Sequence, residues 1–128
     1  MPALNRVQLI GYLGKEPESR FTPNGKKVAH FSIGVTQRRK SGNETKEYTE
    51  WFNVEAWGKL GENASKYLKK GSLVYVDGRL KTDKFEDSKG ETKYFSKVVA
   101  QLMQFLDKKH ADEPAITADE EQAEYETA

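Results

Sequence analysis

Short segments of alternating apolar and polar residues, separated by turn signals, constrain the fold of this chain more than any other feature. Period-two alternation indicates β-strands that bury one face. Residues 58–68 instead carry apolar side chains at helical spacing, and Gly71 follows two lysines, as is typical of a helix end. The predicted strands are residues 6–13, 28–37, 47–57, 73–80 and 94–106, of which the last has apolar groups on both faces. The order is therefore three strands, one helix and two strands.

This order predicts an all-β chain folded as a five-stranded Greek-key barrel, the OB-fold, with one helix between strands 3 and 4. A small SH3-like barrel is the alternative, but it explains a helix at that point less well. Within residues 73–80 we expect Val76 and Leu80 to be among the side chains that face the core. His30 lies on the polar face of residues 28–37, and we expect a structural role for it rather than a ligand role.

Charge divides the chain into a basic body and an acidic end. From Asp107 onward there are eight acidic and two basic residues, a net charge of −6, whereas residues 1–106 carry 19 bases and 12 acids, a net charge of +7. A basic body suits a polyanion, although an acidic end can also serve solubility alone. The end has too few large apolar groups to offset the entropy of ordering it. We expect a domain over residues 1–107 and a disordered acidic tail over residues 108–128.

Missing residue types and motifs argue against several classes of protein. The chain has no cysteine, and His30 and His110 lie far apart, so no metal site is expected. It has no phosphate-cradling loop, H-E-x-x-H or G-x-S-x-G motif, so we expect neither an enzyme nor a cofactor. No apolar run approaches the ~18 residues of a membrane span, and no signal peptide is evident. We therefore expect a cytoplasmic protein.

Two tryptophans on one strand give the strongest indication of function. Trp51 and Trp57 share the polar face of their strand with Asn53 and Glu55, while the residues that alternate with them face the core. Large exposed rings usually have a partner. Single-stranded nucleic acid is a natural one, because every base has a π-face that can stack on a flat ring. Packing under a loop or in a subunit interface is the alternative for either ring.

Two polar hairpin arms add a further ring and positive charge. The first arm is residues 38–46 and the second arm is residues 81–93, which carries Phe85 among lysines. Such an arm can bring ammonium groups to phosphates and its ring to a base. Packing within the loop is the alternative for Phe85, and a solvated turn is the alternative for the basic triplet of the first arm. The candidate phosphate contacts are Arg38, Arg39, Lys40, Lys59, Lys70, Arg79, Lys81 and Lys84.

Several separate motifs resemble those of bacterial-type single-stranded DNA-binding proteins. They are VQLIGYLGKEPE (7–18), RFTPNG (20–25), TEW (49–51), WGKL (57–60), YLKKGS (67–72) and VYVDGRLKT (74–82), which follow the family's order over about residues 4–106. The resemblance implies an OB-fold, a homotetramer with DNA wrapped around it, and nucleoid-associated work in DNA replication, recombination and repair without a cofactor or catalysis. It also implies that Trp51, Trp57 and Phe85 stack on bases.

Departures from the family pattern qualify these expectations. The first arm is shortened and has no aromatic residue near Arg39 or Lys40, where the family has a further stacking tryptophan, so we expect a greater dependence on charge. Phe52 stands where the family commonly has a histidine near a subunit contact. The chain ends in EYETA (124–128) without the family's Pro-Phe tip, which argues against docking of replication and repair proteins there. An OB-fold protein–protein adaptor of primosome-accessory type and a single-stranded RNA-binding module remain the alternatives.

Overall fold

The computed structural model describes residues 2–107 and 116–117. In this part of the chain the elements, in order, are β1 (Val7–Leu13), β2 (Glu18–Phe21), β3 (Lys27–Ser41), β4 (Glu44–Trp57), α1 (Gly58–Tyr67), β5 (Leu73–Glu86), β6 (Thr92–Phe105) and β7 (Ile116–Thr117). Within these residues, no helix has the length and apolar character needed to cross a membrane.

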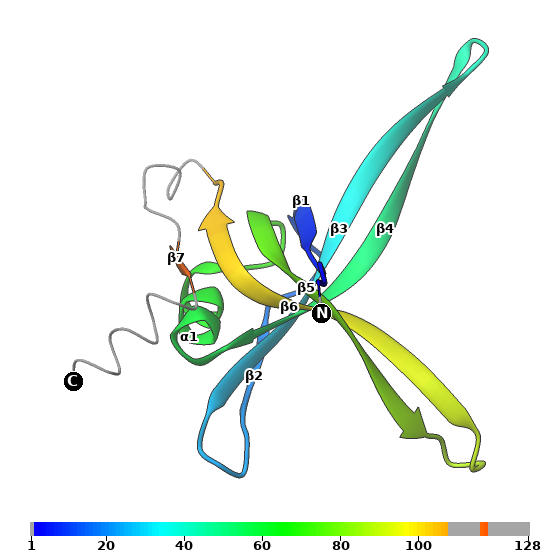
Figure 1. The fold of residues 1–128 in the computed structure, drawn as a ribbon. Helices are drawn as coiled ribbons and strands as arrows, with labels where there is room; N and C mark the ends of the chain where they lie inside the picture. Colours follow the sequence, from blue (N-terminus) through cyan, green and yellow to red (C-terminus); the bar gives the residue numbers. More distant parts are fainter. Residues whose placement is uncertain (1, 108–115, 118–128) are drawn as a thin grey trace.

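Five of the strands close into a barrel (Figure 1). Hydrogen bonds join them in the order β1-β5-β6-β4-β3, and β3 returns to β1, where Leu13 pairs with Ile33. The neighbours are antiparallel except for β4 and β6, which run parallel. The single described helix lies between β4 and β5, so the predicted OB-fold is confirmed. β2 and β7, which we did not predict, pair with β3 and β6.

The core of the barrel consists of the inward faces of these strands and one face of α1. Ile33, Val54 and Val76 are fully buried, as the alternation of their strands predicts. Leu60 and Ala64, one turn apart on α1, are buried in the same cluster. The core is therefore filled without either tryptophan.

Leu80 lies opposite the buried Val98 of β6, on the face that strand alternation predicts, but it is not buried in the core. Its side chain is 46% exposed. The register between β5 and β6 shifts between Asp77 and Gly78, and β5 then continues into the second arm. The extra residue of this shift is Gln101 of β6, so the alternation of faces along β5 continues. Leu80 is exposed because β5 leaves the barrel there, and an arm outside the barrel has no opposite sheet to cover it. Alternation therefore predicts the face of a residue, but it predicts burial only within the barrel.

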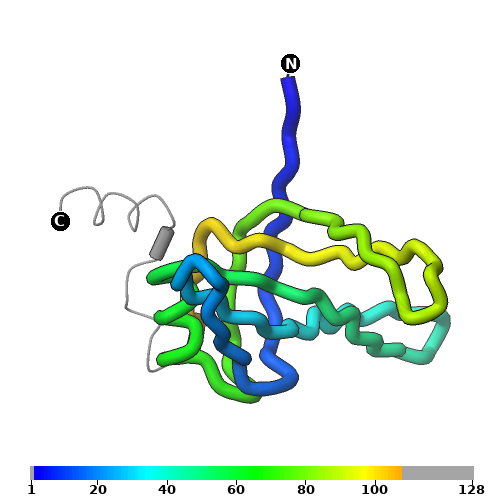
Figure 2. Tube along the Cα trace, turned by 90° about the horizontal axis from the view of Figure 1, so that it is seen from below, coloured from blue at the N-terminus to red at the C-terminus, as the bar shows by residue number. Residues whose placement is uncertain are grey.

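Both arms are extensions of the barrel strands. The β3–β4 ladder continues to the pair Ser41 and Glu44, and the β5–β6 ladder continues to Glu86 and Thr92. Figures 1 and 2 show that both arms project from the same side of the barrel, while α1 lies on the opposite side. The barrel therefore presents two adjacent hairpins to one side.

The predicted boundary at residue 107 and the predicted disorder of residues 108–128 stay predictions. Apart from Ile116–Thr117, the tail lies outside the described residues. Those two residues form β7, which pairs antiparallel with Leu102 and Met103 of β6.

Candidate nucleic-acid interface

Trp51 and Trp57 lie on the face of β4 that points away from the core. The side chain of Trp51 is 58% exposed and that of Trp57 is 38% exposed, whereas Val54 and Ala56 on the opposite face are buried. The predicted strand face is confirmed for both rings. Neither indole is sealed inside the protomer, so a base can approach both from solvent.

The indole of Trp51 is backed by the main chain of two glycines. A Cβ atom on Gly14 would lie 2.6 Å from Cζ3 of Trp51, and a Cβ atom on Gly34 would lie 3.0 Å from the same atom. Neither glycine has a positive φ, so backbone conformation does not require glycine at either position. A side chain there would displace the ring. The two glycines thus close one side of the indole and leave stacking to the other.

The first arm presents its basic triplet at the outer end of β3. Arg38, Arg39 and Lys40 are exposed, and alternation directs Arg39 to the opposite face from the other two. Nε of Arg38 lies 2.8 Å from Oε1 of Glu47 across the hairpin, with both side chains more than half exposed. Such a pair contributes little to stability. The guanidinium therefore stays accessible to a phosphate.

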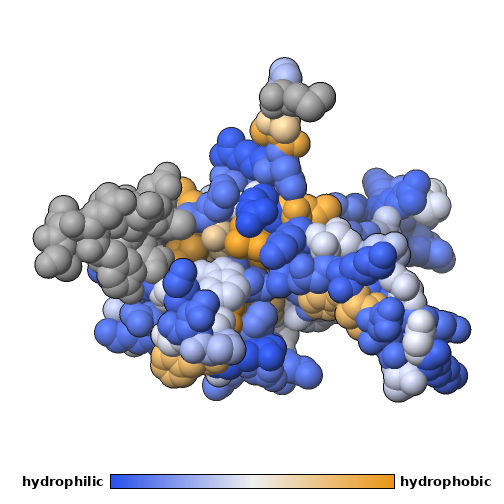
Figure 3. All heavy atoms as spheres, turned by 60° about the horizontal axis from the view of Figure 1, so that its bottom comes forward, coloured by the Kyte–Doolittle hydropathy of each residue, from blue (hydrophilic) through white to orange (hydrophobic). Residues whose placement is uncertain are grey.

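The second arm carries Phe85 together with Lys84. Phe85 is 48% exposed, so it is not packed away within its loop. The turn at the tip is held by Asp87, whose Oδ1 accepts hydrogen bonds from the backbone N–H groups of Lys89 and Glu91 at 2.9 Å each. These hydrogen bonds, that from Glu91 above all, lower the pKa of Asp87. The tip is thus ordered by its own side chain, and Phe85 lies on β5 just before it. Figure 3 shows that both arms, at the right, are mainly hydrophilic.

The structure brings only some of the predicted phosphate contacts together. Arg79 and Lys81 lie where β5 leaves the barrel for the second arm, close in sequence to Lys84. Lys59 lies in the first turn of α1, and Lys70 lies in the turn between α1 and β5. α1 lies on the side of the barrel opposite the arms (Figure 1). A nucleic-acid strand that contacts all the predicted residues must pass around the barrel.

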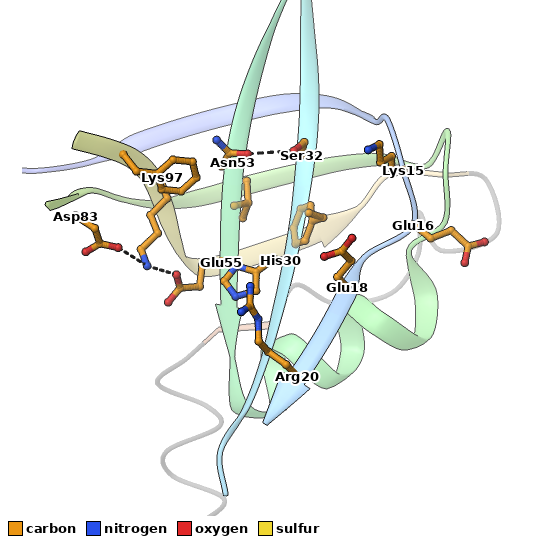
Figure 4. Close-up of a pocket in the computed structure, with 13 residues that line it drawn as sticks. Lys15, Glu16, Glu18, Arg20, His30, Ser32, Asn53, Glu55, Asp83 and Lys97 are labelled. Carbon is orange, nitrogen blue, oxygen red and sulfur yellow. Dashed lines mark hydrogen bonds and ion pairs between the residues drawn. The ribbon is translucent and has the colours of Figure 1, made fainter. Parts of the chain in front are cut away.

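A polar cavity of about 380 Å³ lies on the same face as the tryptophans. Figure 4 shows side chains from several strands around it, and the residues that line it include Lys15, Arg20, His30, Asn53, Glu55 and Lys97. Burial, followed by the positive charge of Arg20, lowers the pKa of His30. His30 is therefore neutral near pH 7. Among the described residues, no group of three or more His, Cys, Asp or Glu is placed to hold a metal ion.

Sequence reasoning missed several residues of this surface. Tyr48, Tyr94 and Phe95 are 45%, 68% and 44% exposed and lie on the strands that form the arms. The sequence prediction gave no role to these three residues or to Lys97, because Tyr48 lies in a polar stretch and residues 94–106 carry apolar groups on both faces. The paired hairpins show where each strand has left the barrel, and the sequence carries no clear signal for that point.

A closed OB barrel with outward indoles and two polar hairpin arms is typical of proteins that bind single-stranded nucleic acid. The model of the Single-strand binding protein family matches residues 4–106. The chain belongs to this family. "Single-stranded DNA-binding protein 1" of Chlorobaculum tepidum is 45% identical over 105 residues, which are 80% of this chain. This chain spans 65% of the length of that curated relative.

A solved structure shares the fold. "Plasmodium falciparum SSB complex with ssDNA" superposes with a TM-score of 0.71 at 32% sequence identity, covering 78% of this chain and 89% of that chain.

Proposed function

We propose that this chain binds single-stranded DNA without sequence preference, by stacking bases on Trp51, Trp57 and Phe85. The observation that carries the proposal is that two indoles of β4 point to solvent from a barrel whose core is filled by other side chains. Stacking needs only the π-face that every base has, and each stacked base contributes ~1–3 kcal/mol. The single-stranded DNA in the Plasmodium falciparum complex supports the same ligand here.

Positive charge supplies the part of binding that is independent of sequence. Residues 1–106 carry a net charge of +7. Lysine and arginine side chains that neutralise phosphates release counterions, so the affinity falls as salt rises. The proposed phosphate contacts are Arg38, Arg39, Lys40, Lys59, Lys70, Arg79, Lys81 and Lys84. Because the first arm lacks an aromatic residue, we propose a larger share of binding from charge than from stacking on that arm.

We also propose that the chain protects single-stranded DNA during replication, recombination and repair, as a homotetramer on nucleoid DNA in the cytoplasm. Family membership and the similarity to the Chlorobaculum protein support this role. In this proposal the protein acts by binding, without catalysis or a cofactor.

Competition binding tests the proposal. A labelled oligo-dT is titrated with the protein, and unlabelled DNA, RNA of the same length and duplex DNA then compete for it. We expect single-stranded DNA to compete well and duplex DNA to compete poorly. Stronger competition by RNA would assign the chain to the RNA-binding modules. Feeble binding to every nucleic acid would favour a protein–protein adaptor instead.

A further inference from the structure

A buried carboxylate and a buried ammonium group meet beside Trp57. The Glu55 side chain is 4% exposed and the Lys97 side chain is 15% exposed. Oε1 of Glu55 accepts a hydrogen bond from the Nε1–H of Trp57, and Oε2 of Glu55 pairs with Nζ of Lys97. Nζ of Lys97 also lies 2.8 Å from Oδ2 of Asp83. Figure 4 shows Lys97 reaching between the two carboxylates.

The three charged residues belong to three strands. Glu55 is on β4, Asp83 is on β5 and Lys97 is on β6. β4 and β6 pair in parallel where Val54 lies opposite Val98, and from there towards the tips the two hairpins separate (Figure 1). The ion pairs therefore lie at the fork between the arms and connect the strand of Trp57 to the arm of Phe85.

Stability alone does not explain this arrangement. The cost of removing two charges from water offsets most of their attraction, and an apolar pair of similar size is often as stable. Burial disfavours the charged form of Lys97, but hydrogen bonds with Asp83 and Glu55 outweigh it and raise the pKa of Lys97. The ammonium form is thus retained and holds the Glu55 carboxylate in place. An apolar pair would offer no acceptor to the indole N–H of Trp57.

We propose that Glu55, held by Lys97, is a positioning residue for base stacking, because it fixes the N–H edge of the Trp57 indole while the ring stays exposed. This inference rests on the proposed binding of single-stranded DNA. Glu55 acts through Trp57 and does not touch the DNA, since its carboxylate is buried. Without this hydrogen bond the ring has more rotational freedom, and the entropy lost when a base immobilises it weakens binding.

Hydrogen exchange of the indole protons tests the hydrogen bond in the unmodified protein. The two Nε1–H signals are assigned by NMR with the Trp51→Phe variant. We expect the Nε1–H of Trp57 to exchange with water more slowly than that of Trp51, whose side chain is 58% exposed. Equal exchange rates would overturn the proposal. This measurement needs no DNA, so its result stands even if the proposed function fails.

A double-mutant cycle tests the effect on stacking. Glu55→Val removes the acceptor, and we expect it to weaken oligo-dT binding about three- to tenfold, within the range of one stacked base. Glu55→Gln keeps an acceptor oxygen and should stay within about twofold. In a Trp57→Phe background, which has no indole N–H at position 57, Glu55→Val should weaken oligo-dT binding by less than about twofold. Equal losses in both backgrounds would assign Glu55 to general packing and overturn the proposal.

Glu50→Val is the matched control, because Glu50 is an exposed carboxylate on the same strand and its loss changes the net charge equally. We expect Glu50→Val to bind oligo-dT at least as tightly as the unmodified protein. A loss equal to that of Glu55→Val would show that the effect does not depend on contact with Trp57, which contradicts the proposal. If circular dichroism shows that Glu55→Val does not fold, the exchange rates of the unmodified protein decide the question.

Discussion

The indole of Trp51 occupies the space that a side chain at Gly14 would need. The three atoms nearest to a Cβ on Gly14 all belong to the Trp51 ring, at 2.6, 2.7 and 3.6 Å. Contacts shorter than 3.0 Å force a neighbour to move, and an aromatic ring cannot yield by bending. The position of the ring therefore depends on the absence of a side chain at Gly14.

Gly14→Ala is expected to weaken binding of single-stranded DNA by displacing Trp51. The loss should approach that of Trp51→Ala, within the ~1–3 kcal/mol of one stacked base. Fluorescence anisotropy with a labelled oligo-dT measures it. In a Trp51→Ala background the methyl group has free space, so Gly14→Ala should have little further effect there. Additive losses would show that Gly14 acts independently of the ring.

Trp51→Ala and Trp57→Ala should each weaken binding of oligo-dT by ~1–3 kcal/mol, because each removes a stacking surface. Isothermal titration calorimetry at fixed salt gives the affinities. The Trp→Phe variants keep a π-face and should lose less. Unchanged affinity in both alanine variants would reassign the rings to packing or to a subunit contact.

Lysines on the arms should set the salt dependence of binding. Replacing Lys40 or Lys84 with alanine should reduce the slope of log K against log salt by about one, since each neutralises one phosphate. Lys66→Ala is the control, because Lys66 is not one of the proposed phosphate contacts and its Nζ lies over the Tyr67 ring, 5.2 Å from the centroid. Titrations at several salt concentrations measure the slopes. Equal slopes for all variants would exclude the arms as the phosphate-binding surface.

Stability should decrease as the pH falls below about 6.5, because burial lowers the pKa of His30 from its ordinary 6.5. Above 6.5 the residue is neutral in both states. At lower pH the unfolded chain takes up the proton more readily, so the free energy of unfolding falls until the pH passes the folded pKa. Asp77, Asp83 and Asp87 have pKa values below 3.8, so their contributions are lost only at lower pH.

Urea unfolding at pH 7.5 and pH 5 measures this effect, with His30→Gln as the comparison. The variant has no titrating imidazole at position 30, so its loss of stability between the two pH values should be smaller. The same loss in both proteins would show that His30 does not contribute.

Local alternation was sufficient to predict the barrel and the outward face of β4. The pattern around Trp51 and Trp57 alone places both indoles opposite the core, as the structure confirms. It overestimated the burial of Leu80, because the spacing of apolar residues does not show where β5 leaves the barrel. The alternation of apolar and polar residues predicts which side chains are buried only where another layer covers the strand.

The contact between Glu55 and Lys97 could not be predicted from the sequence. Strand alternation places Glu55 on the same face as the two tryptophans. Its partner Lys97 lies on β6, more than forty residues further along the chain. Only the closure of the barrel brings β4 beside β6. Interactions between strands that are not joined by a hairpin depend on that closure, which short-range patterns do not specify.

Quenching of tryptophan emission shows whether both outward indoles of β4 stack on bases. The Trp51→Phe and Trp57→Phe variants each leave one indole, and both are titrated with oligo-dT to saturation, with binding followed in parallel by anisotropy. We expect the emission of each remaining tryptophan to fall as DNA binds. Saturated binding with unchanged emission from both indoles would contradict it.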